Sequence, residues 1–98
     1  METKFDSEKL KEVCRKNGIE FLGIFGSRAR GDPRENGDVD LLVRFTDPNI
    51  GLFEHLRIEG HLAEVFDGRK VDLVSERALH PYLRSYVSQN LKVLYERR

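Results

Sequence analysis

Residues 19–45 read IEFLGIFGSRARGDPRENGDVDLLVRF, and they contain the clearest pair of strand signals in the chain. Two runs rich in β-branched and aromatic residues, 19–25 and 38–45, flank a loop that contains Gly, Pro and Asn. Such runs, bounded by turn-forming residues, are typical of β-strands. Because the loop between them is short, we expect the two strands to be neighbours in one sheet.

Apolar residues at helical spacing predict two helices. The first covers residues 7–17 and ends at Asn17-Gly18. Cys14 belongs to its apolar stripe, which predicts a buried thiol rather than a reactive one. The second helix covers residues 51–66. The apolar face expected on this second helix consists of Leu52, Leu56, Ala63 and Phe66.

The remaining signals complete the order of elements. A third strand is predicted at residues 70–75, a third helix from His80-Pro81, and a last strand at residues 91–95. Strands alternating with helices place the chain in the α/β (α+β) class, as a small mixed β-sheet flanked by helices. A chain of 98 residues has room for one core, so we expect a single domain over residues 1–98.

The composition is that of a small globular domain away from membranes. Hydrophobic residues make up 39% and charged residues 35% of the chain, and no run of about 18 apolar residues is present. The charged N-terminus lacks the apolar region of a signal peptide. Cys14 is the only cysteine, which rules out a disulfide framework and favours a reducing cytoplasm. The 17 basic and 17 acidic residues balance, which argues against a dedicated duplex-DNA binder.

Three aspartates in the predicted strands carry the strongest chemical signal. Side chains alternate along a strand, so Asp38 and Asp40 share one face while Val39 and Leu41 enter the core. Asp72 interrupts the apolar third strand in the same way. If that strand lies beside the Asp38 strand, the three carboxylates form one cluster. Neighbouring carboxylates repel, and a hard cation such as Mg²⁺ relieves the repulsion. Three carboxylates are what a two-metal phosphoryl or nucleotidyl transfer site needs.

The loop before Asp38 is suited to binding a phosphate group. Gly26 lets the backbone approach a ligand closely because it has no Cβ. Ser27 opens a predicted helical turn, where free N–H groups favour an anion, and its hydroxyl can donate a hydrogen bond. Arg28 and Arg30 add charge-assisted donors. The P-loop pattern GxxxxGK[ST] and the dinucleotide pattern GxGxxG are both absent.

Together these residues resemble a known family. Gly26-Ser27, followed after ten residues by Asp38-Val39-Asp40 and by a later strand aspartate, is similar to the nucleotidyltransferase superfamily that includes DNA polymerase β. The segments GSRARGD, DVDLLV and RKVDLVSERAL resemble the minimal nucleotidyltransferases, and the resemblance covers nearly the whole chain. One departure is Gly37, where such motifs often have serine.

The resemblance implies a polymerase β-like fold and a role for each site residue. Asp38 and Asp40 would be ligands of both Mg²⁺ ions. Asp72 would be a ligand of the catalytic ion and would activate the attacking hydroxyl. Gly26 and Ser27 would hold the triphosphate of ATP.

The resemblance also implies a partner. Members of the family are commonly encoded beside a HEPN-domain ribonuclease toxin and act as its antitoxin. Some transfer AMP from ATP to a tyrosine of that toxin. We therefore expect a cytoplasmic nucleotidyltransferase antitoxin whose acceptor hydroxyl comes from a partner protein.

Other interpretations remain open. The chain could neutralise a toxin by binding alone, with a site that no longer catalyses. It could be a nucleic-acid-binding regulator if its arginines form one patch. That patch would consist of Arg28, Arg30, Arg34 and Arg44. The apolar faces left on so small a domain could serve a partner or a homo-oligomer. The three histidines lack metal-ligand spacing, and the tyrosines are expected to pack rather than to accept AMP.

Overall fold

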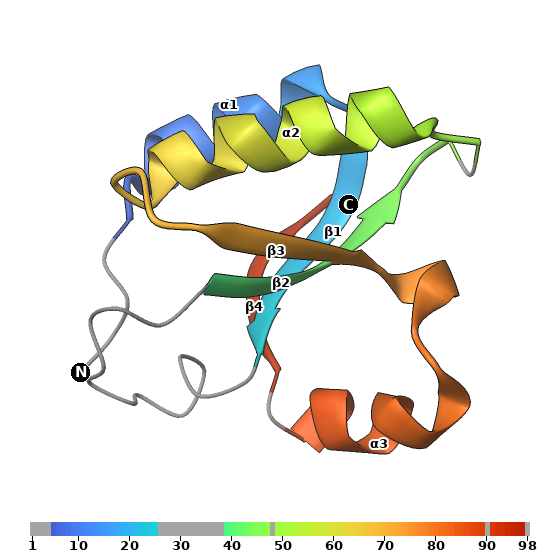
Figure 1. Ribbon diagram of the computed structural model, residues 1–98. Coiled ribbons are helices and arrows are strands. Elements are labelled where there is room, and N and C mark those ends of the chain that lie inside the picture. The colour runs from blue at the N-terminus through green and yellow to red at the C-terminus, as the bar shows by residue number, and fades with distance from the viewer. Residues whose placement is uncertain (1–4, 26–38, 48, 90, 98) are drawn as a thin grey trace.

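The protein folds as a four-stranded sheet with helices on both sides (Figure 1). The computed structural model describes residues 5–25, 39–47, 49–89 and 91–97. The strands are β1 (Ile19–Phe25), β2 (Val39–Phe45), β3 (Val71–Ser75) and β4 (Lys92–Glu96). The helices are α1 (Ser7–Lys16), α2 (Leu52–Val65) and α3 (Pro81–Gln89), with a 3₁₀ turn, η2 (Glu76–Ala78), after β3. In this described part, no helix has the length and apolar character needed to cross a bilayer.

The sheet is mixed, as predicted, with the spatial order β3-β2-β1-β4. β1 pairs antiparallel with β2 and with β4, while β2 pairs parallel with β3. A parallel pair needs a crossover connection, and α2 provides it between β2 and β3. α1 and α2 cover one face of the sheet, and α3 lies on the opposite side (Figure 1). Among the described residues, α3 is the only α-helix on the side of the sheet away from α1 and α2.

Helix α1 begins and ends for local reasons. The Asp6 side chain accepts hydrogen bonds from the backbone N–H groups of Glu8 and Lys9, each at 3.1 Å, and so caps the helix. The helix ends at Lys16, one residue before the predicted end, because Asn17 is the C-cap and Gly18 takes a positive φ of 66°. The predicted stop signal is therefore confirmed.

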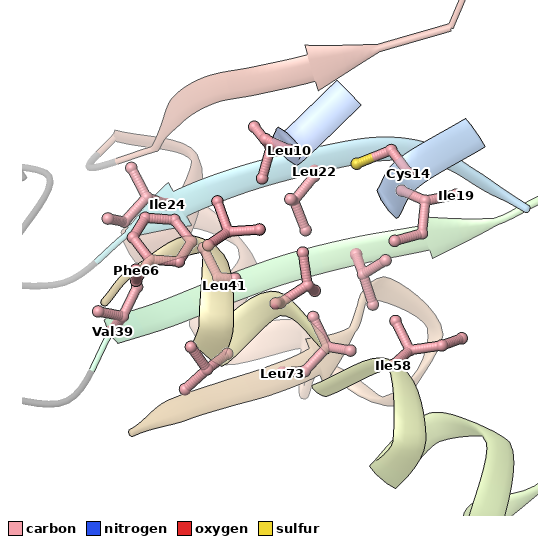
Figure 2. Close-up of a cluster of buried hydrophobic side chains, with 14 residues drawn as sticks. Leu10, Cys14, Ile19, Leu22, Ile24, Val39, Leu41, Ile58, Phe66 and Leu73 are labelled. Atoms are coloured by element: carbon pink, nitrogen blue, oxygen red, sulfur yellow. The ribbon is translucent and has the colours of Figure 1, made fainter. Parts of the chain in front are cut away.

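The hydrophobic core lies between the sheet and helices α1 and α2 (Figure 2). Val39, Leu41 and Val43 of β2 are completely buried. Leu22 of β1 and Phe66, which ends α2, pack into the same cluster. Alternate residues of β2 thus face the core, which confirms the predicted strand pattern. The residues between them are left for the other face.

The buried face of α2 differs from the predicted one. Ile58, Leu62 and Val65 are buried, whereas Leu52 is 71% exposed and Leu56 is 50% exposed. Apolar residues occur on more than one side of this helix, so spacing alone did not identify the core side. The prediction for Leu52 and Leu56 was wrong because packing against the sheet selected the stripe of residues 58, 62 and 65.

The C-terminal elements lie close to their predicted places. α3 begins at Pro81, and His80 acts as a helix-start residue, since its Nδ1 accepts a hydrogen bond from Tyr82 N–H at 3.2 Å. β4 begins at Lys92 instead of residue 91. Leu91 instead lies against Gly23 of β1, where a Cβ on the glycine would come within 2.5 Å of the Leu91 Cδ1.

This close approach predicts opposite effects for two glycine substitutions. Gly23→Ala should lower the free energy of unfolding by about 1–3 kcal/mol, the usual cost of overpacking. Gly60→Ala in α2 should raise it by about 0.5–1 kcal/mol, because alanine is the better helix former and its Cβ would meet nothing within 4 Å. Urea denaturation monitored by circular dichroism gives the free energy of unfolding of both variants. Equal changes in this free energy would contradict the packing at Gly23.

The buried thiol leads to a second prediction. Burial raises the pKa of Cys14 from 9.0 to about 12. The unfolded chain therefore loses this proton at a lower pH than the folded chain. The contribution of Cys14 to stability is constant below pH 9 and falls as the pH rises from 9 to 12. A thiol reagent at pH 8 should label Cys14 in urea and leave the native protein unlabelled.

Candidate active site

Two of the predicted carboxylate residues lie next to each other on neighbouring strands. Asp40 of β2 and Asp72 of β3 are register partners in the parallel pair. Neighbouring strands are about 4.8 Å apart. Leu41 and Leu73, the next residues along, are buried in the core, so both aspartates face the side of the sheet away from α1 and α2. Asp40 is half-buried and Asp72 is exposed. The condition on which the carboxylate cluster depended, adjacent strands, is thus met.

The other predicted site residues lie outside the described part of the chain. They are Gly26, Ser27, Arg28, Arg30 and Asp38. Within the described ranges, no three His, Cys, Asp or Glu side chains gather to hold a metal. The predicted set of three needs Asp38, so it remains a prediction.

The described end of β1 lies beside Asp40. Phe25, the last described residue of β1, is the register partner of Asp40. Gly26 and Ser27 come directly after Phe25 in the sequence.

Arg44, further along the same face of β2, is held by two carboxylates. Its Nε donates to Glu20 Oε1 at 2.6 Å, and its Nη1 donates to Glu76 Oε2 at 3.3 Å. The guanidinium also lies over the Phe21 ring, 5.3 Å from its centroid. The hydrogen bond that Arg44 donates to the Glu20 carboxylate raises the pKa of Arg44. Because two acids already neutralise Arg44, it adds little to a basic patch for nucleic acid. The other three arginines of that hypothesis lie outside the described residues.

A cavity of about 280 Å³ lies beneath α3. Its lining residues are Phe21, Leu42, Glu76, Leu79, Arg84, Val87 and Leu91. Leu42, which helps to line this cavity, lies two residues beyond Asp40 on the same face of β2. In the part of the chain that the structure describes, the guanidinium of Arg84 has no hydrogen-bond or ion-pair partner. The volume lies just below the usual range for ligand pockets, about 300–1,000 Å³.

Sequence reasoning missed this cavity. Its lining comes from β1, β2, η2, α3 and their connections, which are far apart in the chain. No local pattern marks Arg84 as a site residue. The one sequence signal was Leu42, an apolar residue on the same face as the aspartates.

The fold and the aspartate pair define a class of enzyme, the nucleotidyltransferases. The chain belongs to the family described as "Polymerase beta, Nucleotidyltransferase", which it matches over residues 8–98. The polymerase β-like fold implied by the sequence is confirmed.

Relatives place the chain more closely within this family. The protein adenylyltransferase MntA of Thermococcus cleftensis is 39% identical over 70 residues, which cover 70% of this chain and 68% of that protein. A Methanocaldococcus jannaschii protein is 31% identical over 93 residues, covering 85% of this chain and 92% of the relative. The structure of a toxin–antitoxin complex with AMP-PNP superposes with a TM-score of 0.77 at 25% identity, covering 95% of this chain and 75% of that chain.

Proposed function

We propose that this chain transfers AMP from ATP to a protein hydroxyl, a tyrosine of a HEPN-domain toxin that it neutralises as an antitoxin in the cytoplasm. The observation that carries the proposal is the register pairing of Asp40 with Asp72 on the face of a nucleotidyltransferase sheet that points away from α1 and α2. The adenylyltransferase name of the MntA relative supports protein as the acceptor. The similar toxin–antitoxin complex supports a toxin partner and an adenine nucleotide.

The donor set fits the two Mg²⁺ ions that the family implies. Asp40 and Asp72 supply oxygen ligands from adjacent strands, and we propose Asp38 as the third carboxylate. Hard divalent cations prefer carboxylate and phosphate oxygens. When bound, such ions offset the negative charge that builds up on the phosphoryl oxygens and on the attacking and leaving oxygens.

The protein residues have separate tasks in the transfer. The tyrosine oxygen attacks the α-phosphorus of ATP, and the bond from this phosphorus to the oxygen that bridges to the β-phosphorus breaks. Asp72, the more exposed carboxylate, takes the proton of the attacking hydroxyl. We propose that Gly26, Ser27, Arg28 and Arg30 hold the departing pyrophosphate, because they follow β1 in the sequence and the last described residue of β1 pairs with Asp40.

Replacing either described aspartate tests the proposal. Asp40→Asn and Asp72→Asn should each lower the rate of AMP transfer about 10²–10⁴-fold, as expected when a carboxylate that handles a proton or a cation is lost. Exposed Asp72→Asn should change the free energy of unfolding by no more than about 0.5 kcal/mol. The measurement is transfer of α-labelled AMP, with Mg²⁺, to the protein encoded by the neighbouring gene. Absence of transfer by the folded wild-type protein under every nucleotide would overturn the proposal.

Neutralisation by binding alone is the second candidate function. Leu52, Phe53 and Leu56 are exposed apolar side chains near the start of α2, with Phe53 88% exposed. Such groups favour contact with another protein. In this alternative, Asp40→Asn would still protect cells from the toxin, whereas a catalytic antitoxin would lose protection together with transfer.

We further propose that the cavity beneath α3 receives the nucleoside part of ATP. Its apolar lining suits a base, and the guanidinium of Arg84 can donate to a ring nitrogen or a ribose oxygen.

Arg84→Ala tests this placement. The variant should bind ATP at least about tenfold more weakly, because a hydrogen bond involving a charged group contributes about 1.5–3 kcal/mol. Isothermal titration calorimetry with ATP and Mg²⁺ measures the change. Arg15→Ala is the matched control, since Arg15 is an exposed arginine on α1, across the sheet from the cavity. Equal affinities of the two variants would place the nucleoside elsewhere.

A further inference from the structure

Strand β3 carries Asp72, yet it lies at the edge of the sheet. β2 is its only neighbouring strand in the described part of the molecule. An edge strand normally leaves the N–H and C=O groups on its outer side unpaired, so it is held less firmly than a central strand. A catalytic carboxylate needs a position defined to about 0.5 Å. Something beyond the pairing with β2 should therefore hold β3.

Two side chains of α2 bind the outer edge of β3 at one residue, Leu73. The carboxylate of Glu59 accepts a hydrogen bond from the Leu73 N–H, with Oε2 2.9 Å from the nitrogen. The His55 Nε2 lies 2.8 Å from the Leu73 carbonyl oxygen. A carbonyl oxygen only accepts, so His55 is the donor in this contact. Both outward-facing backbone groups of Leu73 are thus paired.

The helix and a neighbouring ring hold these two side chains in place. His55 and Glu59 are four residues apart in α2, so they lie on the same side of the helix, one turn apart. The His55 ring also meets the Phe45 ring edge-on, with 6.1 Å between the centroids. The helix that makes the crossover from β2 to β3 therefore also holds β3 from its free side.

We infer that His55 and Glu59 are positioning residues that hold Asp72 opposite Asp40. The Leu73 N–H belongs to the peptide group that joins Asp72 to Leu73. Fixing this group restricts rotation of the backbone at Asp72, and the Leu73 side chain is anchored in the core. β2 on one side and Glu59 with His55 on the other thus hold the residue that bears the catalytic carboxylate.

The inference deepens the proposed function, because it rests on Asp72 being a metal-binding and proton-accepting carboxylate. Removing a residue that hydrogen-bonds to a metal ligand typically lowers metal affinity or activity 10–100-fold. We expect an effect of this size, on Mg²⁺ binding and on kcat, with little change in KM for the acceptor.

The experiment compares variants of one helix. Glu59→Ala removes the acceptor for Leu73 N–H, while Glu59→Gln keeps an oxygen that can accept it. His55→Ala removes the donor to the Leu73 carbonyl. Glu64→Ala is the control, because Glu64 is an exposed glutamate of α2 whose carboxylate lies 4.0 Å from Lys9 Nζ, away from β3.

Three measurements are made on each folded variant: amide hydrogen exchange at Leu73, Mg²⁺ affinity by calorimetry, and the kcat and KM of AMP transfer. Glu59→Ala and His55→Ala should weaken Mg²⁺ binding and lower kcat about 10–100-fold. Glu59→Ala should also speed exchange at the Leu73 amide. Glu59→Gln should restore most of each quantity, and Glu64→Ala should match the wild type.

Two outcomes would overturn the inference. In one, Glu59→Ala lowers the melting temperature but leaves Mg²⁺ affinity and kcat unchanged, so the contacts only stabilise the edge strand. In the other, Glu59→Gln is as impaired as Glu59→Ala, so the charge rather than the hydrogen bond matters. If the wild type binds Mg²⁺ but transfers no label, the proposed function fails by itself, and the Mg²⁺ affinities of the variants still decide the inference.

Discussion

The parallel register between β2 and β3 is the constraint on which the site depends. It pairs Val39 with Val71, Asp40 with Asp72, and Leu41 with Leu73. A slip of one residue would turn each aspartate toward the core and each apolar residue toward solvent. Burying the apolar partners therefore also keeps the two carboxylates side by side.

Helix α2 contributes to this arrangement in three ways. It forms the crossover that lets β2 and β3 run parallel, whereas a hairpin loop can join only antiparallel strands. Its buried stripe at Ile58, Leu62 and Val65 covers the core side of the strands. Its His55 and Glu59 pair the outer backbone groups of Leu73. Stability and site geometry consequently depend on the same helix, although it faces away from the site.

Local patterns predicted the strands well and the helix faces less well. A run such as VDLLVRF has one apolar side in a strand, so its core face follows from alternation alone. In α2, apolar residues occur on several sides, and only contact with the sheet selected Ile58 over Leu56. The ion pairs of Arg44 could not be predicted from local patterns either, because its partners Glu20 and Glu76 are 24 and 32 residues away in the chain.

The order of elements, the alternation that puts aspartates opposite core residues, and the family were all readable in the amino-acid sequence. The first two depend on neighbours within a few residues, where steric and periodic rules are strong, and the family follows from the spacing of the motif residues along the chain. The pairing of Asp40 with Asp72, the cavity beneath α3 and the contacts of α2 with Leu73 were decided by tertiary structure alone. These features join groups 14 or more residues apart, and only the register of the sheet and the packing of helices upon it bring them together.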